Sequence, residues 1–307
     1  MLVNTEELQK RVDRFSWMYE KHRGILDIEE QKAFKGVGLS KSSLDRINRS
    51  VDHFFETVPQ ETPAMKVGSA FHCLALEPHK FINEYVCAPE VDRRTSAGKK
   101  EYAQFEADNP KKTIISVADW EMIHLMVQSL ENTPIAAEML RPSAGEVEET
   151  MMWNDRELGT LMKGRSDFRN NEQKVIIDLK STMDASADKL EKDLWSNDLR
   201  YHVQAAIYTD GIREILGEED WEFRFIFVEK KPPYGVRVVS LPEEGLDVGR
   251  IQYRDNIRYL LNWIEEAKEA IKNKTPAPRP YQEELLTLSP PAWLVQKVRK
   301  TRFKQSL

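Results

Sequence analysis

The segment VIIDLK, Val175 to Lys180, constrains the fold of this 307-residue chain more than any other stretch. It is a nearly continuous apolar strand that ends in charges. Residues two apart in a strand point the same way, so Asp178 and Lys180 share one face, and Ile177 and Leu179 share the other. Burying the two charges unpaired is costly. The segment therefore predicts a buried strand whose charged end has partners.

A second acidic residue is expected to face this strand. The segments Leu161–Phe168 and Lys174–Leu179 predict two antiparallel strands of a meander. Residues 169–171 would join them, because asparagine tolerates the left-handed conformation that a tight reversal needs. Asp167 and Asp178 then lie on adjacent strands and can face each other across the turn.

Two facing carboxylates and a lysine favour a metal-dependent hydrolase. Close carboxylates raise one another's pKa unless a positive charge lies between them. A hard divalent cation with oxygen ligands, Mg²⁺ or Mn²⁺, suits that position, and such a site suits phosphodiester hydrolysis. Lys180 would orient the water or stabilise the transition state, and the sequence leaves both roles open. The alternative for the pattern alone is a surface hairpin with a salt bridge.

Two further features are candidates for the same site. His72 lies on a predicted buried helix, Met65–Leu76, on the same face as Gly68. Taken alone, His72 is more simply explained as a hydrogen-bonded core histidine. Gln204 and Tyr208 lie four apart on one helical face, and a helix at the edge of the core would explain them equally well.

The remaining pattern predicts an α/β domain with peripheral additions. Leu8, Val12, Phe15 and Tyr19 have the spacing of one amphipathic helix, and Ser40 is the expected N-cap of another. Gly217 is the expected C-cap of the helix that carries Gln204. Further helices are expected at Thr5–Glu20, Ala118–Leu130, Asp188–Asp198, Leu199–Leu216 and Glu243–Asn273, and further strands at Val147–Trp153, Trp221–Glu229 and Val236–Leu241.

Composition excludes several classes of protein. Hydrophobic residues make up 40% and charged residues 31%, which is typical of a soluble globular protein and not of a disordered chain. No apolar run approaches the length of a membrane span, and the N-terminus lacks the pattern of a secretory signal. Cys73 and Cys87 are too few for a disulfide framework. We therefore expect a cytoplasmic protein with no membrane partner.

The net charge of −6 argues against a protein that coats nucleic acid, although a local basic surface could still bind it. Each basic group is also compatible with ordinary solvated surface. The candidates are Lys99 with Lys100, Lys111 with Lys112, the group Lys163, Arg165 and Arg169, and a C-terminal group of Lys297, Arg299, Lys300, Arg302 and Lys304.

Taken together, the motifs resemble the PD-(D/E)xK nuclease superfamily. The chain resembles most closely the nuclease domain of exodeoxyribonuclease VIII (RecE) and its phage relatives. The resemblance begins near Gly38 and ends near Pro291. The matching segments are GLSKSSL, GSAFH with LEP downstream, CAPEVDRRTSAGKKEY, GRSD, VIIDLKST, RYHVQAAIYTDG and LSPPAWL. The fold that it implies is a mixed central sheet flanked by helices.

The resemblance also implies roles for individual residues. His72, Asp167 and Asp178 would be metal ligands, and Leu179 would be a ligand through its backbone carbonyl. Lys180 would be the catalytic lysine. Gln204 and Tyr208 would support the site and the DNA phosphates. Either Glu148 or Glu149 would join the site, and the sequence does not choose between them.

The implied activity is Mg²⁺-dependent, processive 5′ to 3′ digestion of one strand at double-stranded DNA ends. It would leave 3′ single-stranded tails for a single-strand annealing partner in recombination. Family members of this kind form rings, so a homo-oligomer with a positive channel is expected. Two other activities remain open: an endonuclease or single-strand-specific nuclease, and a non-catalytic DNA-binding scaffold.

Three segments divide the chain on this interpretation. Residues 1–37 would form a helical extension, residues 38–295 the nuclease domain, and residues 296–307 a basic tail. One departure from the family pattern lies in the nuclease domain. Ser166 precedes Asp167 where family members commonly have proline, a change expected to alter local rigidity more than ligand chemistry.

Overall fold

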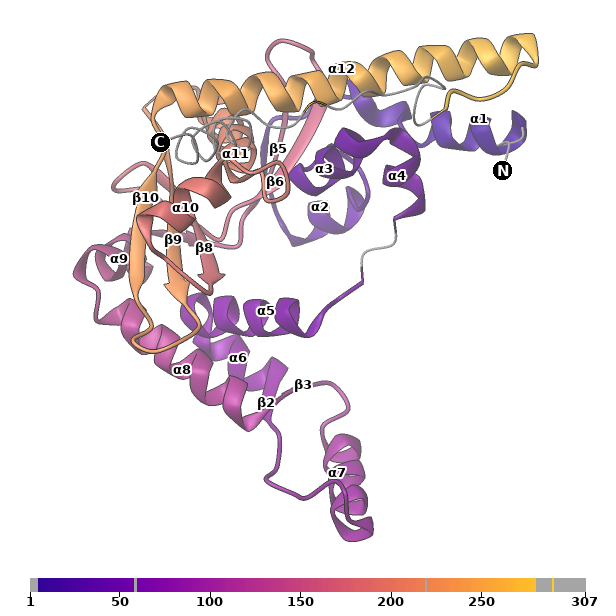
Figure 1. The fold of residues 1–307 in the computed structure, drawn as a ribbon. Coiled ribbons are helices and arrows are strands. Elements are labelled where there is room, and N and C mark those ends of the chain that lie inside the picture. The colour runs from indigo at the N-terminus through magenta and orange to yellow at the C-terminus, as the bar shows by residue number, and fades with distance from the viewer. Residues whose placement is uncertain (1–4, 58–59, 219, 280–288, 290–307) are drawn as a thin grey trace, which may run out of the picture.

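A computed structural model describes residues 5–57, 60–218, 220–279 and 289 (Figure 1). The helices are α1 Thr5–Asp13, η1 Ser16–Tyr19, α2 Ile28–Ala33, α3 Lys41–Arg49, α4 Val51–Glu56, α5 Pro63–Leu76, α6 Pro78–Glu84, α7 Ser96–Asp108, α8 Val117–Glu131, α9 Pro134–Met139, η2 Pro142–Ala144, α10 Ala187–Leu194, α11 Tyr201–Leu216 and α12 Glu243–Asn273. The strands are β1 Gly24–Leu26, β2 Tyr85–Cys87, β3 Thr113–Ile115, β4 Gly145–Val147, β5 Thr150–Asn154, β6 Leu161–Arg165, β7 Phe168–Asn170, β8 Val175–Thr182, β9 Glu222–Glu229 and β10 Val236–Ser240.

The central sheet has five strands in the order β10-β9-β8-β7-β4. β8 and β9 are parallel, and the other neighbours in this sheet are antiparallel. A parallel pair cannot be joined by a tight hairpin, and here α10 and α11 make the connection. The predicted mixed sheet flanked by helices is confirmed.

The two faces of β8 pack into different cores. Ile176 belongs to the core that contains α11 and α12. Ile177 and Leu179 belong to a second core with Phe71 of α5 and Ile123 of α8. Side chains alternate along a strand, so Asp178 and Lys180 share a face opposite to Ile177 and Leu179, as the sequence predicts. In the structure this polar face meets α11.

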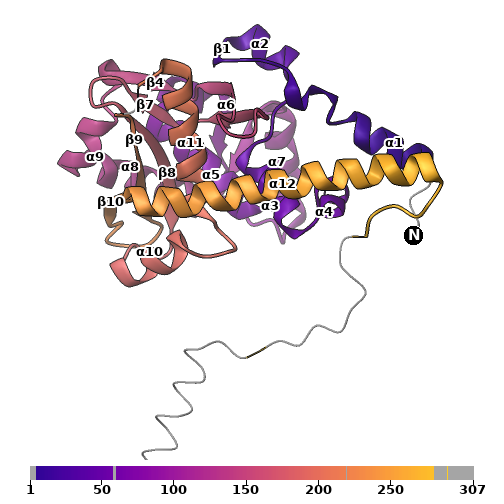
Figure 2. The same ribbon diagram turned by 90° about the horizontal axis from the view of Figure 1, so that it is seen from above.

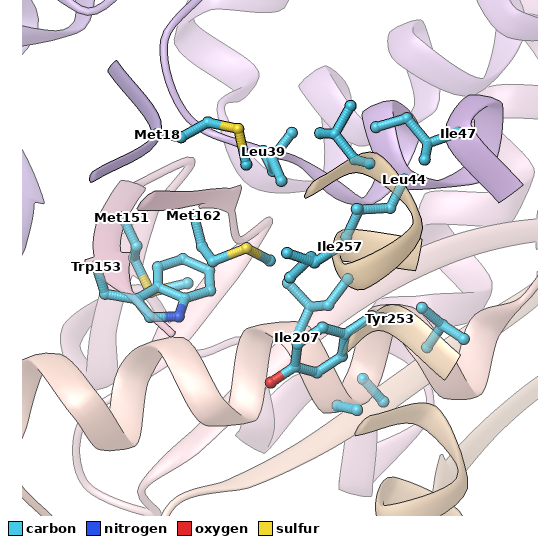
Figure 3. Packing of buried hydrophobic residues seen from close by; sticks show 14 of the residues in the cluster. Met18, Leu39, Leu44, Ile47, Met151, Trp153, Met162, Ile207, Tyr253 and Ile257 are labelled. Atoms are coloured by element: carbon cyan, nitrogen blue, oxygen red, sulfur yellow. The ribbon is translucent and has the colours of Figure 1, made fainter. Parts of the chain in front are cut away.

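The larger core joins segments that are distant in the sequence (Figure 3). Met18 of η1 and Leu44 of α3 lie on one side of it. Trp153 of β5 and Tyr253 of α12 are almost fully buried in the same cluster. The N-terminal segment is therefore part of the packed body.

Two predicted strands are each divided in the structure. Val147–Trp153 forms β4 and β5, and Leu161–Phe168 forms β6 and β7, in different sheets. Glu148 adopts the left-handed conformation with φ 55°, which a regular strand cannot accommodate. The two antiparallel chain segments therefore bend together, from the central sheet, where they form β4 and β7, into the sheet β1-β5-β6, where they form β5 and β6.

The predicted hairpin exists, but its turn lies further along the chain. β7 and β8 are antiparallel, with Phe168 opposite Ile177. The left-handed residue is Lys174, with φ 52°, and not one of the two asparagines. Asn170 instead ends β7, and its side chain accepts a hydrogen bond from the backbone of Gln173 at 2.8 Å.

The single helix predicted for Thr5–Glu20 is wrong. The chain leaves the α-helix after Asp13 and continues as η1, so Tyr19 is 62% exposed and does not face the core. The break lets Phe15 pack against Phe54 and Phe55 of α4. The extension is also not purely helical, because β1 pairs with β5.

α12 runs the length of the body, with α1 packed beside its far end (Figure 2). Its bounds match the predicted helix, and the caps predicted at Ser40 and Gly217 are confirmed. None of the described helices combines the length and apolar composition needed to cross a membrane. The basic tail predicted for residues 296–307 lies outside the described residues.

Candidate functional site

The charges at the end of β8 have partners. Asp178 is 3% exposed, and its Oδ1 contacts Nζ of Lys180. Its Oδ2 accepts a hydrogen bond from Nε2 of Gln204 on α11. Nζ of Lys180 also lies 5.4 Å from the ring centroid of Tyr201. One helix, α11, thus braces both charged residues of the strand.

Asp167 reaches the same place from the bend between β6 and β7. The register that pairs Phe168 with Ile177 puts Asp167 opposite Asp178 when it is extended by one residue. Its Oδ2 accepts a hydrogen bond from the backbone N–H of Leu179 at 2.7 Å and lies 3.4 Å from Nδ1 of His72. α5 therefore brings His72 to the strand end.

Glu148 completes a group that could hold a metal ion. Ligand atoms of His72, Glu148 and Asp167 all lie within 4.8 Å of one another. Glu149 points to a different partner, since its carboxylate binds Arg169 at 2.5 and 3.0 Å. The structure thus brings Glu148, and not Glu149, to the candidate ligands.

Asp178 is not a member of that three-residue group. Its two oxygens are engaged by Lys180 and Gln204 instead. Leu179 approaches Asp167 through its N–H. The ligand roles expected for the Asp178 carboxylate and the Leu179 carbonyl therefore remain predictions.

The pKa values of the acidic residues in the site are shifted in opposite directions. Burial raises the pKa of Asp178 to about 6, against the opposing effect of the Lys180 charge. Burial also raises the pKa of Glu148. Burial opposes ionisation of Asp167, but the charge and hydrogen bond of His72, the Lys180 charge and the Leu179 N–H together outweigh it, so the pKa of Asp167 is lowered. Such opposed shifts are typical of functional sites.

The basic groups of the site favour their charged forms. Burial lowers the pKa of His72, but the charge and hydrogen bond of Asp167 outweigh burial, so the net shift is upward. Burial also lowers the pKa of Lys180, but the adjacent Asp178 and Asp167 outweigh burial and raise its pKa overall. Lys180 therefore keeps its positive charge beside the acids.

A basic cavity of about 540 Å³ adjoins the site through Gln204 and Tyr208. The Tyr208 hydroxyl is hydrogen-bonded by the backbone of Arg165. Glycine at position 164 leaves room for this ring, because a Cβ there would lie 3.0 Å from it. Among the described residues, the charged ones that line the cavity are all cations: Arg14, Lys41, Arg46, Lys163 and Arg165.

The sequence anticipated only part of this cavity. Lys163 and Arg165 belong to a basic group named from the sequence, whereas Arg14, Lys41 and Arg46 were missed. Arg14 follows α1, and Lys41 and Arg46 belong to α3, so these residues are far in sequence from Lys163 and Arg165 of β6 and meet them only in the folded protein. Lys99 and Lys100 lie on α7, in the lobe that projects from the body (Figure 1).

Residues 40–274 match the family model described as a PDDEXK-like domain. The chain belongs to that family. The model covers every residue of the candidate site. No curated protein sequence matches this chain at a significant level.

Two solved structures are similar to this PDDEXK-like protein. One is described as a "putative exonuclease" from Eubacterium rectale, with a TM-score of 0.51 and 15% identity over 88% of this chain and 97% of that one. The other is a phage-related exonuclease from Haemophilus somnus 129PT, with a TM-score of 0.28 and 13% identity over 78% and 97%. The first likeness shows the fold, and it agrees with the family assignment. Family and fold support a nuclease.

Proposed function

We propose that this protein is a Mg²⁺-dependent DNA exonuclease that digests one strand of duplex ends from 5′ to 3′. The observation that carries the proposal is the convergence of Asp167, Asp178 and Lys180 with His72 at the edge of a basic cavity. A scaffold that only bound DNA would gain nothing from two buried carboxylates beside a lysine.

The residues present fit a hard divalent cation. Two carboxylates and an imidazole, from three separate elements, place their donor atoms within 4.8 Å of one another. Oxygen-rich donor sets favour Mg²⁺ or Mn²⁺. A bound cation of this kind supplies charge neutralisation at the phosphate and lowers the pKa of water. His72, Glu148 and Asp167 would hold it, with Asp178 adjacent.

The other residues position and charge the site. Gln204 holds one oxygen of Asp178 and Lys180 holds the other, so the carboxylate cannot rotate freely. The raised pKa of Lys180 keeps its ammonium charged. It can therefore orient a water molecule or stabilise the negative charge that develops on a phosphate.

The basic cavity offers a path for the DNA backbone. Phosphate contacts from arginine and lysine supply most of the sequence-independent affinity for DNA. No described carboxylate forms an ion pair with Arg14 or Arg46, and both guanidinium groups lie over the ring of Phe54 beside the cavity. Among the described residues, Arg46 donates hydrogen bonds only to the carbonyls of Ser42 and Thr57, so both positive charges stay without a neutralising acid. Because Gln204 contacts both the cavity and Asp178, a strand bound in the cavity leads to the candidate metal ligands.

The parts of the proposal that concern the direction of digestion, the 3′ single-stranded tails and the partners rest on the resemblance to exodeoxyribonuclease VIII. The names of the two similar structures are in keeping with exonuclease activity. On this basis we propose that the protein acts on double-stranded DNA ends, as a homo-oligomeric ring, and passes 3′ tails to a single-strand annealing protein in recombination.

Labelled substrates test the proposal. Linear duplexes carrying a label on either the 5′ or the 3′ end, and covalently closed circles, are incubated with Mg²⁺. Early release of the 5′ label as a mononucleotide, with intact circles, is the expected result. Cleaved circles would establish an endonuclease, and early 3′ release would reverse the polarity.

Two variants connect the activity to the site. Asp178→Ala should abolish Mg²⁺-dependent hydrolysis while the protein stays folded. Lys180→Ala should lose hydrolysis while metal affinity, measured by calorimetry, changes little. Equal activity of Asp178→Ala and the unaltered protein would refute the assignment of the site to these residues.

A further inference from the structure

Gly68 differs from the other glycines inside the described helices. A Cβ on Gly98, Gly211, Gly245 or Gly249 would come within 2.2–2.8 Å of an atom of this chain, so the fold itself requires glycine at those positions. A Cβ on Gly68 would meet no described atom within 4 Å. Packing within the chain therefore does not explain this glycine.

A glycine in the middle of a helix is unfavourable. It destabilises the helix relative to alanine, because glycine loses more backbone freedom on folding. Gly68 lies in the interior of α5, a helix of 14 residues whose other side chains are apolar or small apart from Lys66 and His72. Gly68 thus lowers the stability of the helix and allows no close packing contact in return. This indicates that the space beside Gly68 is used by something outside the chain.

The space lies beside the candidate metal ligands. Residues four apart share a helical face, so Gly68 lies one turn from His72. The opposite face of α5 is buried, with Val67, Ala70 and Phe71 in the second core. Met65, on the open side one turn further from His72, is 53% exposed. Lys66 is also exposed, but it lies two residues from Gly68, so it does not share that face, and it pairs with Glu61 at 3.7 Å. The face that carries Met65, Gly68 and His72 therefore combines an open space with an apolar side chain.

The cations near the site lie on elements other than α5. In Figure 1, α5 lies on one side of the end of β8, and α2 and α3 lie on the other. Of the cations that line the basic cavity, Lys41 and Arg46 belong to α3. A nucleotide has the same division, with an anionic phosphate on one side and an uncharged sugar and base on the other.

We propose that the gap at Gly68 receives the sugar and base of the nucleotide next to the phosphate held at the metal site. This inference rests on the proposed nuclease function and adds to it a residue that determines whether DNA fits. Glycine is required there for the substrate, because any larger side chain at that position would fill the space.

A size series at position 68 tests the inference. Gly68→Ala and Gly68→Leu are compared with the unaltered protein in melting temperature, Mn²⁺ affinity and kcat/KM on linear duplex DNA. Gln128→Leu is the matched control, because it adds leucine at an exposed position of α8, which packs on the buried face of α5.

The expected result separates stability from activity. Both variants should melt at or above the temperature of the unaltered protein and bind Mn²⁺ normally. Gly68→Leu should lose at least tenfold in kcat/KM on DNA, Gly68→Ala less, and Gln128→Leu nothing. Wild-type kcat/KM in Gly68→Leu would overturn the inference, as would a parallel loss of Mn²⁺ affinity, which would place the effect at the metal ligands. Failure of the proposed function appears separately, as an unaltered protein that does not cleave DNA.

Discussion

At the scale of single residues, the bend before Asp167 positions the site. Ser166 is completely buried, and its backbone N–H donates to the carbonyl of Glu149 at 3.1 Å. In the other direction, the N–H of Glu148 donates to the carbonyl of Asp167 at 3.0 Å. These two hydrogen bonds keep the two chain segments paired at the bend where they leave the central sheet. The backbone of Ser166 therefore matters more than its side chain.

Ser166→Pro should destabilise this protein, although relatives commonly have proline there. Proline removes the N–H that bonds Glu149, and we expect a loss of about 1 to 3 kcal/mol in the free energy of unfolding. Ser166→Ala is the control, because the hydroxyl has no partner among the described residues and its removal should change stability by less than about 0.5 kcal/mol. Urea denaturation measures both, and equal stability of the two variants would contradict the prediction.

Metal affinity should rise with pH, because protons compete for the same groups. The pKa of His72 is raised by Asp167 despite burial, and burial raises the pKa of Asp178 to about 6. Metal binding requires neutral imidazole and ionised carboxylates. The affinity should fall as the pH decreases, because His72 takes up a proton, and it should fall more steeply toward pH 6, where Asp178 begins to take one up as well.

Calorimetric titration with Mn²⁺ between pH 5 and 8 checks this expectation. His72→Asn should lower the slope of log affinity against pH by up to about one proton, because the titrating imidazole is gone. An affinity independent of pH between 5 and 7 would show that neither His72 nor Asp178 is linked to the metal.

At the scale of helices and strands, residue periodicity predicted the elements that each remain one continuous helix or one strand of a single sheet. α12, α8 and the apolar strand β8 follow from spacing and from caps that a short window contains. The divided strands could not be found that way. Each reads as one apolar run, and the change of sheet depends on a left-handed Glu148 that no local signal specifies.

The same limit applied to the candidate site. Asp167, Asp178 and Lys180 follow from strand alternation and a hairpin. The choice of Glu148 over Glu149 depends on which way the bend turns, and that depends on Arg169, a partner twenty residues away that holds Glu149. Tertiary contacts, and not local pattern, decide such cases.

The packing of α11 on β5 sets another limit on sequence change. A Cβ on Gly211 would lie 2.8 Å from the ring of Trp153, which is 2% exposed and cannot move aside easily. Gly211→Ala should therefore cost about 1 to 3 kcal/mol through overpacking. Thermal unfolding measures it, with Gly68→Ala as the matched control, since that substitution meets open space and should not destabilise. A stabilised Gly211→Ala would mean that the helix shifts freely on the sheet.

At the scale of the whole molecule, net charge and local charge differ in sign. The chain carries −6, yet the cavity beside the site is lined by five cations and no acid among the described residues. Burial lowers the pKa of Arg46, and so does the nearby charge of Arg14. Like charges held together in this way repel, and a bound phosphate would relieve the repulsion. The average charge of the chain therefore says little about its affinity for DNA.

Arg46→Gln should weaken DNA binding without weakening the fold. Loss of one phosphate contact should lower the slope of log affinity against log salt by about one unit, and affinity should fall for every sequence alike. Fluorescence anisotropy with a short duplex, with Ca²⁺ in place of Mg²⁺ and over a range of salt concentrations, measures both quantities. Arg258→Gln is the matched control, because Arg258 is an exposed arginine of α12 already paired with Glu157. Arg46→Gln removes the repulsion from Arg14, but it also removes the exposed contacts of Arg46 with the Ser42 and Thr57 carbonyls and the Phe54 ring, so its melting temperature should change little. An unchanged salt slope in Arg46→Gln, or an equal decrease in Arg258→Gln, would show that the DNA backbone does not follow the basic cavity.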